Sequence, residues 1–263
     1  MRANRLLAAT VLSVLGAAGL TACGSGGAEK GDAAPAASAS SAATKPAAGG
    51  GLESLSAEQI LDRMRAANAK ITSVKVVFRV EDSDGDMAGE AFGDAAGNCS
   101  SSVAMEDVGK AEVLRLEGKT WVKPDVEAVR AAYGAKAVTL VAGKWVTAAK
   151  LSGLAEFTGF CDMALDLTKK AGFNEDGTPD NTVTKAGTKK VGGVDAVILT
   201  AEDEDTGDPL EIAIANEGEP YLLSLVTDGR GNLQFSHFNE PVRATAPAAD
   251  QTIDLDALGM APS

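Results

Sequence analysis

The sequence predicts an α+β fold in which one curved antiparallel sheet of about ten strands, a half-barrel, wraps over a few helices. Two observations lead to this prediction. The candidate strands come in long runs and do not alternate one by one with helices, as they would in an α/β fold. Dense turn signals separate them, for example Gly118-Lys119, Gly192-Gly193 and Asp228-Gly229, as is typical of antiparallel neighbours.

The first predicted element is a helix that begins after Ser56. Ser56 and Gln59 have the spacing of a capping box, in which each side chain binds the other residue's backbone N–H. Apolar residues then recur at helical spacing and form one face. This face comprises Ile60, Leu61, Met64, Ala67 and Ile71.

A period of two follows and predicts a half-buried strand over 73–81. Val74, Val76, Phe78 and Val80 alternate there with Lys75, Val77, Arg79 and Glu81. Turn and alternation signals predict further strands over 87–92, 99–105, 111–117, 120–123, 143–146, 181–191, 194–201, 209–216, 220–228 and 231–239. Two more helices are predicted, over 125–133 and 161–170.

Composition narrows the range of functions. The 263 residues include 24 Lys and Arg against 37 Asp and Glu, a formal net charge of −13. This sign is opposite to that of a nucleic-acid-binding surface, so no nucleic acid partner is expected. Three cysteines, one histidine and 4% aromatic residues leave little material for a metal centre or a catalytic triad. We therefore expect neither enzyme activity, nor a bound metal, nor a cofactor.

The N-terminus has the three parts of a processed leader. Arg2 and Arg5 precede an apolar run that ends in Leu20-Thr-Ala-Cys23, and the run is too short to span a membrane. The ending resembles the lipobox of bacterial lipoproteins, which implies cleavage after residue 22 and a diacylglycerol on Cys23. The alternative is an ordinary secretory leader followed by a chance cysteine. Lipidation predicts a protein anchored at the extracytoplasmic face of the cell membrane.

The composition also predicts the domain organisation. Residues 1–22 are the signal peptide, and 23–51 are the lipidated Cys23 with a tether of Gly, Ala, Ser and Pro, too poor in apolar groups to fold. Its root-mean-square reach is roughly 30 Å. Residues 52–258 form the folded domain, and 259–263 are a C-terminal tail. From residue 52 onwards, 20 basic residues face 35 acidic ones, so the domain carries the acidic charge.

Several segments, taken in order, resemble the actinobacterial lipoproteins of the LppX/LprG type, which share the LolA-like fold. The segments are the capped helix with Ile60-Leu61, then 73–78, 143–146, 185–194, 218–222 and 235–242. The resemblance implies a half-barrel over helices that encloses an apolar cavity, and it implies carriage of an acyl lipid or glycolipid through the cell envelope without catalysis. The alternative is a cell-surface module of the same fold that recognises a protein and has a filled core.

The resemblance places the ligand between the sheet and the helices, where the inward apolar residues would line the cavity. Any single one of these residues is also compatible with ordinary core packing. The candidates are Ile60, Met64, Val76, Phe78, Val80, Leu114, Leu116, Ile212, Ile214, Leu223 and Leu225.

The other chemical motifs are weak. Cys99 and Cys161 are an even pair in an exported chain, which predicts a disulfide, the alternative being two buried thiols. Asp82 opens a run that mimics a calcium loop, but the glycine and the final glutamate of such a loop are missing, which favours a solvated turn. His237, placed in a strand with Leu233 and Phe235, is expected to be structural.

Overall fold

A computed structural model describes residues 51–81, 85–147, 152–171, 182–202, 207–227 and 230–259. The predicted signal peptide, the lipidation site Cys23, nearly all of the tether and the Asp82 turn lie outside these residues. The domain boundaries predicted from composition therefore stay predictions.

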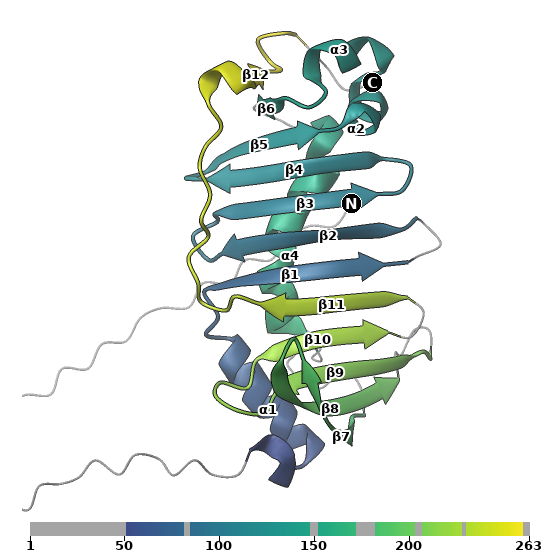
Figure 1. The fold of residues 1–263 in the computed structure, drawn as a ribbon, viewed down its shortest axis with the longest axis vertical. Coiled ribbons are helices and arrows are strands. Elements are labelled where there is room, and N and C mark those ends of the chain that lie inside the picture. Colours follow the sequence, from purple (N-terminus) through teal and green to yellow (C-terminus); the bar gives the residue numbers. More distant parts are fainter. Residues whose placement is uncertain are drawn as a thin grey trace, which may run out of the picture. The chain divides into compact units, whose positions relative to one another are not determined.

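The described residues form one open sheet of twelve strands (Figure 1), in the order β12-β6-β5-β4-β3-β2-β1-β11-β10-β9-β8-β7. All neighbours are antiparallel except β12 and β6, which are parallel, so the sheet is mixed. The two runs of strands meet where β1 pairs with β11. The strands are β1 Ser73–Val80, β2 Met87–Asp94, β3 Cys99–Met105, β4 Gly109–Leu116, β5 Lys119–Pro124, β6 Trp145–Thr147, β7 Thr184–Val191, β8 Val194–Glu202, β9 Pro209–Ala215, β10 Leu222–Thr227, β11 Gly231–Ser236 and β12 Thr252–Asp254.

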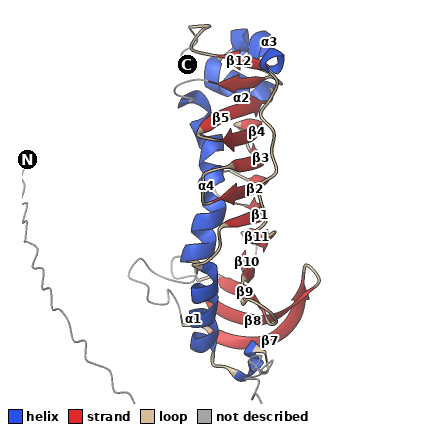
Figure 2. Cartoon of the chain, turned by 90° about the vertical axis from the view of Figure 1, so that its left-hand side faces the viewer, coloured by secondary structure: helices blue, strands red, loops and turns tan. Residues whose placement is uncertain are grey.

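Figure 2 shows α1 and α4 on one face of the sheet, which we call the helix face, while β7 to β9 bend toward the opposite, outer face. The helices are α1 Ala57–Asn68, α2 Val126–Tyr133, α3 Val138–Val141 and α4 Ala155–Lys170, with single 3-10 turns at Leu52–Ser54, Ala135–Ala137, Ser152–Leu154 and Ala249–Gln251. None of the helices in the described ranges has the length and apolar composition needed to cross a membrane.

The start of α1 confirms the capping box. The Ser56 hydroxyl accepts a hydrogen bond from Gln59 N at 3.3 Å, and Gln59 Oε1 accepts one from Ser56 N at 3.1 Å. At the other end, the buried Asn68 connects three elements. Its Nδ2 donates to Thr168 O in α4 at 2.7 Å, and its Oδ1 accepts from Leu222 N in β10 at 3.4 Å. Both ends of α1 are thus fixed by side-chain hydrogen bonds.

Three features differ from the sequence prediction. Helix α4 begins at Ala155, six residues before the predicted start. The sequence does not mark this position, because Leu154, which precedes the helix, has no capping side chain. The sheet has twelve strands, where about ten are predicted, and it is not wholly antiparallel. The unpredicted strand β12 has three residues and pairs with a partner far away in the sequence, so no local period marks it.

Candidate functional site

Eight of the eleven predicted ligand-lining residues lie on the helix face. Their exposed fractions decide whether they line a cavity: Ile60, Met64, Val76 and Ile214 are 0% exposed, and Ile212 is 1% exposed. A side chain that a water-sized sphere cannot touch has no space for a water molecule beside it. The remaining three residues are Phe78, which is buried, and Val80 and Leu225, which are partly buried. In this structure seven of the eight residues, all except Val80, belong to the packed core or pack against it, and a ligand-lining role for the eight stays a prediction.

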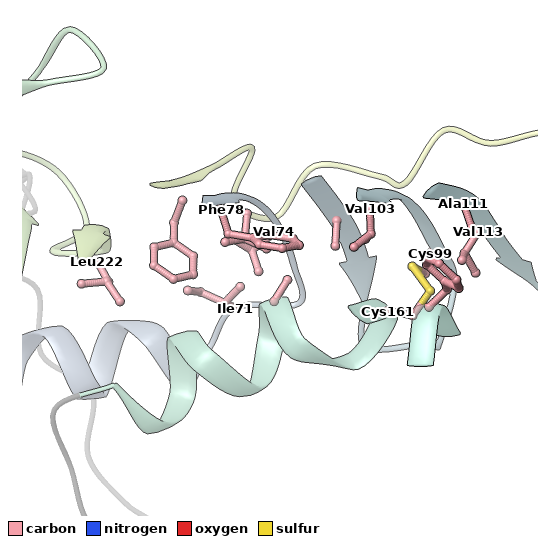
Figure 3. Packing of buried hydrophobic residues seen from close by; sticks show 14 of the residues in the cluster. Ile71, Val74, Phe78, Cys99, Val103, Ala111, Val113, Cys161 and Leu222 are labelled. Carbon is pink, nitrogen blue, oxygen red and sulfur yellow. A yellow bond between two sulfur atoms is a disulfide. The ribbon is translucent and has the colours of Figure 1, made fainter. Parts of the chain in front are cut away.

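The packing between β1 to β4 and α4 is direct (Figure 3). The Phe78 ring stacks on the Phe160 ring with centroids 5.2 Å apart and planes 2° apart. Beside them, Cys99 of β3 and Cys161 of α4 form the predicted disulfide, with Cα atoms 5.5 Å apart. Cys161 lies near the middle of α4 and not at its N-terminus, where the predicted range 161–170 would place it. The bridge therefore ties the middle of α4 to β3.

The prediction that Leu114 and Leu116 share the inward face is wrong. Cys99 pairs with Arg115, and the Arg115 guanidinium binds the Asp162 carboxylate of α4 at 3.1 and 2.5 Å. Arg115 therefore faces the helix, and its neighbours at positions 114 and 116 face outward. The residues of β4 that pack beneath α4 are Ala111 and Val113. Both faces of β4 carry apolar residues, so the sequence pattern alone does not identify the inner one.

Leu223 is also on the other face from Leu225. A β-bulge between Leu222 and Ser224 shifts the register of β10 against β9. Leu222 and Leu225 consequently belong to the helix-face core, whereas Leu223 joins a second apolar cluster on the outer face. The bulge breaks the period of two, so the predicted alternation is wrong at this strand. The outer-face cluster comprises Leu223, Ala196, Ile198, Ala213 and Ala215, with Val191 and Phe238 packed against it.

This second cluster borders a groove of about 430 Å³ on the outer face. Such a volume lies within the usual range for pockets that hold small molecules or side chains, about 300–1,000 Å³. We call it the outer groove. Its lining residues are Val77, Val191, Gly192, Val194, Ala215, Glu217, Glu219, Tyr221, Leu223, Gln234, Phe235, Ser236, His237 and Phe238.

Two apolar residues of the outer groove are unusually exposed. Val77 of β1 and Val194 of β8 are each 43% exposed, although they lie on strands that are separated in the sheet by β11, β10 and β9. They line the same groove because the β7–β8 hairpin bends over the outer face (Figure 2). Gly192 and Gly193, with φ of 58° and 87°, supply the left-handed conformations that this two-residue turn requires. The groove therefore has two accessible apolar walls.

One end of the outer groove is formed by the segment that leaves β11. Tyr221 and Phe238 stack with ring centroids 4.5 Å apart, and Asn239 holds this corner through its φ of 60°. The Asn239 Nδ2 donates to the Tyr221 hydroxyl at 2.9 Å, and its Oδ1 accepts from Thr72 N at 2.8 Å. A non-glycine residue in the left-handed region costs free energy, and these hydrogen bonds hold it there.

His237 lies just after strand β11, whereas the sequence predicts it within that strand. Strand β11 ends at Ser236, and His237 has a φ of 54°, so the alternation with Leu233 and Phe235 stops before it. The exposed imidazole lies beside the Phe92 ring, with centroids 6.0 Å apart, and its Nδ1 is 3.0 Å from the Ser236 hydroxyl. The only histidine of the chain is therefore part of the groove wall.

The charges at the outer groove are unevenly distributed. Glu217 and Glu219 line it, while none of its lining residues is Lys or Arg. The nearby lysines of the outer face are paired with carboxylates, Lys75 with Glu90 at 2.7 Å and Lys189 with Glu211 at 2.5 Å. Lys190, on the opposite side of the β7–β8 hairpin, pairs with Asp195 at 2.8 Å. Within the described ranges, no cluster of three or more His, Cys, Asp or Glu residues is arranged to hold a metal ion.

The groove residues come from several strands and turns, and most of them were not among the predicted site residues. One signal was present in the sequence: Val77 is apolar although its outward neighbours Lys75 and Arg79 are charged. A single exposed valine is common on protein surfaces. Only the fold brings Val194 and Leu223 beside it, so the sequence could not distinguish a site from an isolated apolar residue.

No protein-family model matches the sequence, and neither does any curated protein. Solved structures of similar arrangement share little sequence with the chain. An uncharacterized conserved protein from Thermus thermophilus is 11% identical over 75% of this chain and 98% of its own, with a TM-score of 0.34. MucB in the Pseudomonas aeruginosa MucA/MucB complex is 18% identical over 73% of this chain and 59% of its own, with a TM-score of 0.32. A LolA superfamily protein from Nitrosomonas europaea is 11% identical over 73% of this chain and 96% of its own, with a TM-score of 0.21.

Proposed function

We propose that this chain is an exported, lipid-anchored and non-catalytic binding protein that takes a bulky apolar group in its outer groove. The observation that carries the proposal is the exposure of Val77 and Val194, both 43%, on opposite walls of one 430 Å³ hollow. Apolar side chains left in water without a partner are unfavourable, and a group that fills the space between them gains free energy by covering both.

The alternative of a lipid held between sheet and helices has less support. That interior is filled by side chains such as Val76 and Ile214, which have no accessible area. A ligand there would have to separate the sheet from α4, and the Cys99–Cys161 disulfide opposes such a movement. Of the two functions considered from the sequence, recognition by a domain with a filled core therefore agrees better with the packing. Kinship with the LppX/LprG type and a role in envelope lipid transport stay predictions.

The second part of the proposal is attachment to the membrane through acyl chains on Cys23. Two or three acyl chains on Cys23 provide stable membrane attachment, at about 0.8 kcal/mol for each buried CH₂ group. The tether would place the domain at the extracytoplasmic face of the cell membrane, within roughly 30 Å of the anchor. The lipobox residues 20–23 support this part of the proposal.

The outer groove can be tested with a neutral fluorescent probe, N-phenyl-1-naphthylamine, titrated into the mature chain carrying Cys23→Ser. The double variant Val77→Gln with Val194→Gln keeps the charge and removes both apolar walls. We expect about tenfold weaker probe binding, equivalent to about 1.4 kcal/mol. The control is Val126→Gln on α2, since Val126 is 44% exposed but lies outside the groove.

Binding that is unchanged in the double variant, or that the control weakens as much, would overturn the groove as the binding site. The interior alternative has its own signature. Probe binding that Val76→Phe abolishes while Val77→Gln leaves it intact would place the ligand between the sheet and α4.

A further inference from the structure

We infer that the occupant of the outer groove is a basic segment of a partner protein, in which bulky apolar side chains are flanked by Lys or Arg. This inference rests on the proposed function, because it assigns a ligand class to the same groove. Apolar surface and negative charge occur there together, and a partner must satisfy both. A segment with cationic residues beside apolar ones does so.

The charge argument starts from the turn between β9 and β10. Glu217 and Glu219 on this turn line the outer groove, and no ion pair involving either is formed within the described part of the chain. The two lysines on the outer face near the groove, Lys75 and Lys189, have carboxylate partners. The carboxylates at the groove are thus available, whereas those lysines are neutralised by their own neighbours.

The cations Arg63 and Lys70 of α1 and its C-terminal turn do not change this distribution. They line a neighbouring hollow that Glu217 and Glu219 also border, together with Gly51 and Pro220. Neither cation lines the outer groove, and no ion pair joins them to these two carboxylates in the described part of the chain. Glu217 and Glu219 are therefore the charged residues at the wall of the outer groove itself, and they repel the carboxylate or phosphate group of a common lipid.

Polar groups in the groove favour a polypeptide over a purely apolar ligand. Gln234, Ser236 and His237 line it together with the apolar residues, and Gln234 and His237 are exposed. A peptide carries backbone N–H and C=O groups that lose their water on binding and need such partners. The domain as a whole, with 35 acidic and 20 basic residues from residue 52 onwards, attracts a basic partner at longer range.

The experiment uses three peptides with the common core Phe-Leu-Ala-Phe-Leu, flanked on each side by two Lys, two Gln or two Glu. Each competes with N-phenyl-1-naphthylamine for the mature chain carrying Cys23→Ser. We expect the Lys-flanked peptide to bind about tenfold more tightly than the Gln-flanked one, the Glu-flanked peptide to bind most weakly, and the preference to shrink with added salt.

The acidic residues are tested by the double variant Glu217→Gln with Glu219→Gln. It should remove most of the preference for Lys and leave binding of the Gln-flanked peptide unchanged. The matched control is Glu58→Gln with Glu127→Gln, which changes the net charge equally at exposed positions outside the groove. A control that removes the preference equally would overturn the local role of Glu217 and Glu219.

Failure of this inference can be told apart from failure of the groove. If Val77→Gln with Val194→Gln weakens probe binding but the three peptides compete equally, the groove stands and the basic segment is wrong. If palmitate displaces the probe and no peptide does, the occupant is an acyl chain and the peptide is again wrong. If the valine variants have no effect on any ligand, the proposed function itself fails.

Discussion

Gly93 of β2 lies directly against the backbone of Cys161 in α4. A Cβ atom on Gly93 would stand 2.8 Å from the Cys161 carbonyl oxygen, closer than van der Waals contact allows. Gly93 is also paired with Cys99 across β2 and β3. The close approach of helix and sheet therefore occurs beside the disulfide, and it depends on a residue without a side chain.

We therefore expect Gly93→Ala to lower the free energy of unfolding by about 1–3 kcal/mol, the usual cost of overpacking. The neighbouring atom is backbone in a disulfide-bonded helix, so it cannot move aside easily. Urea denaturation measures the loss. The control is Gly231→Ala in β11, where a Cβ would meet its nearest atoms at 3.8 and 3.9 Å. Equal effects of the two substitutions would contradict the steric explanation.

Loss of the disulfide should cost more. Cys99→Ala together with Cys161→Ala opens a loop of 62 residues, for which the chain-entropy model gives about 4 kcal/mol. Urea denaturation of the oxidised parent and of the double variant measures this difference. Dithiothreitol should destabilise the parent and have no effect on the variant. Two alkylatable thiols in the native parent would show that the bridge is absent.

Neighbouring residues of β1 allow a test of whether the interior is filled. Val76 is 0% exposed on the helix face and Val77 is 43% exposed on the outer face. Val76→Phe should cost about 1–3 kcal/mol of unfolding free energy by overpacking, whereas Val77→Phe should change it by less than about 0.5 kcal/mol. Thermal and urea unfolding of both variants provide the measurement. A Val76→Phe protein as stable as its parent would reveal vacant space and revive the interior lipid site.

The anchor prediction concerns Cys23. A Cys23→Ser chain should lose its acyl groups and leave the membrane fraction, because the tether of small and polar residues offers no apolar anchor of its own. Membrane fractionation and mass spectrometry of the N-terminal peptide measure both effects. Ser25→Ala, two positions further on, serves as the control and should remain anchored. Membrane retention of the Cys23→Ser chain would refute lipidation at this site.

Tyr133 should make the free energy of unfolding depend on pH in the alkaline range. Burial raises the pKa of Tyr133 above its usual 10, and the negative charge of Asp256 adds to the rise. Folding thus favours the neutral phenol of Tyr133 over the phenolate. The stability that this preference contributes is complete below the pKa that Tyr133 has in the unfolded chain, and it is lost as pH rises through the pKa that Tyr133 has in the folded chain. Above about pH 10, Tyr133→Phe should therefore reduce the fall of unfolding free energy with pH.

The Tyr133 effect is measured by urea unfolding at several alkaline pH values, with tyrosine absorbance to follow ionisation. Asp256→Asn provides the second arm, because it removes the charge and should lower the pKa of Tyr133 toward its usual value. An alkaline stability profile that is identical in Tyr133→Phe and the parent would exclude this linkage.

The sequence by itself determined the elements whose signals are local. The capping box at Ser56 and Gln59 marked the start of α1, and the alternation in 73–80 marked both faces of β1. The glycine pair at 192–193 marked the β7–β8 turn. Each of these signals lies within a few residues, and the geometry of a helix, strand or turn fixes its spacing. Residues of this kind could be assigned without knowing their neighbours in space.

Only the tertiary structure decided which apolar face is inside and where a ligand finds room. The prediction for Leu114 is wrong because both faces of β4 carry apolar residues and only the pairing with β3 shows which one is inside. The prediction for Leu223 is wrong because a bulge breaks the period of two in β10. The exposure of Val77 acquires meaning only beside Val194, a residue more than a hundred positions away. Pairing between distant segments is decided by the packing of the whole chain, and no local pattern in the sequence records it.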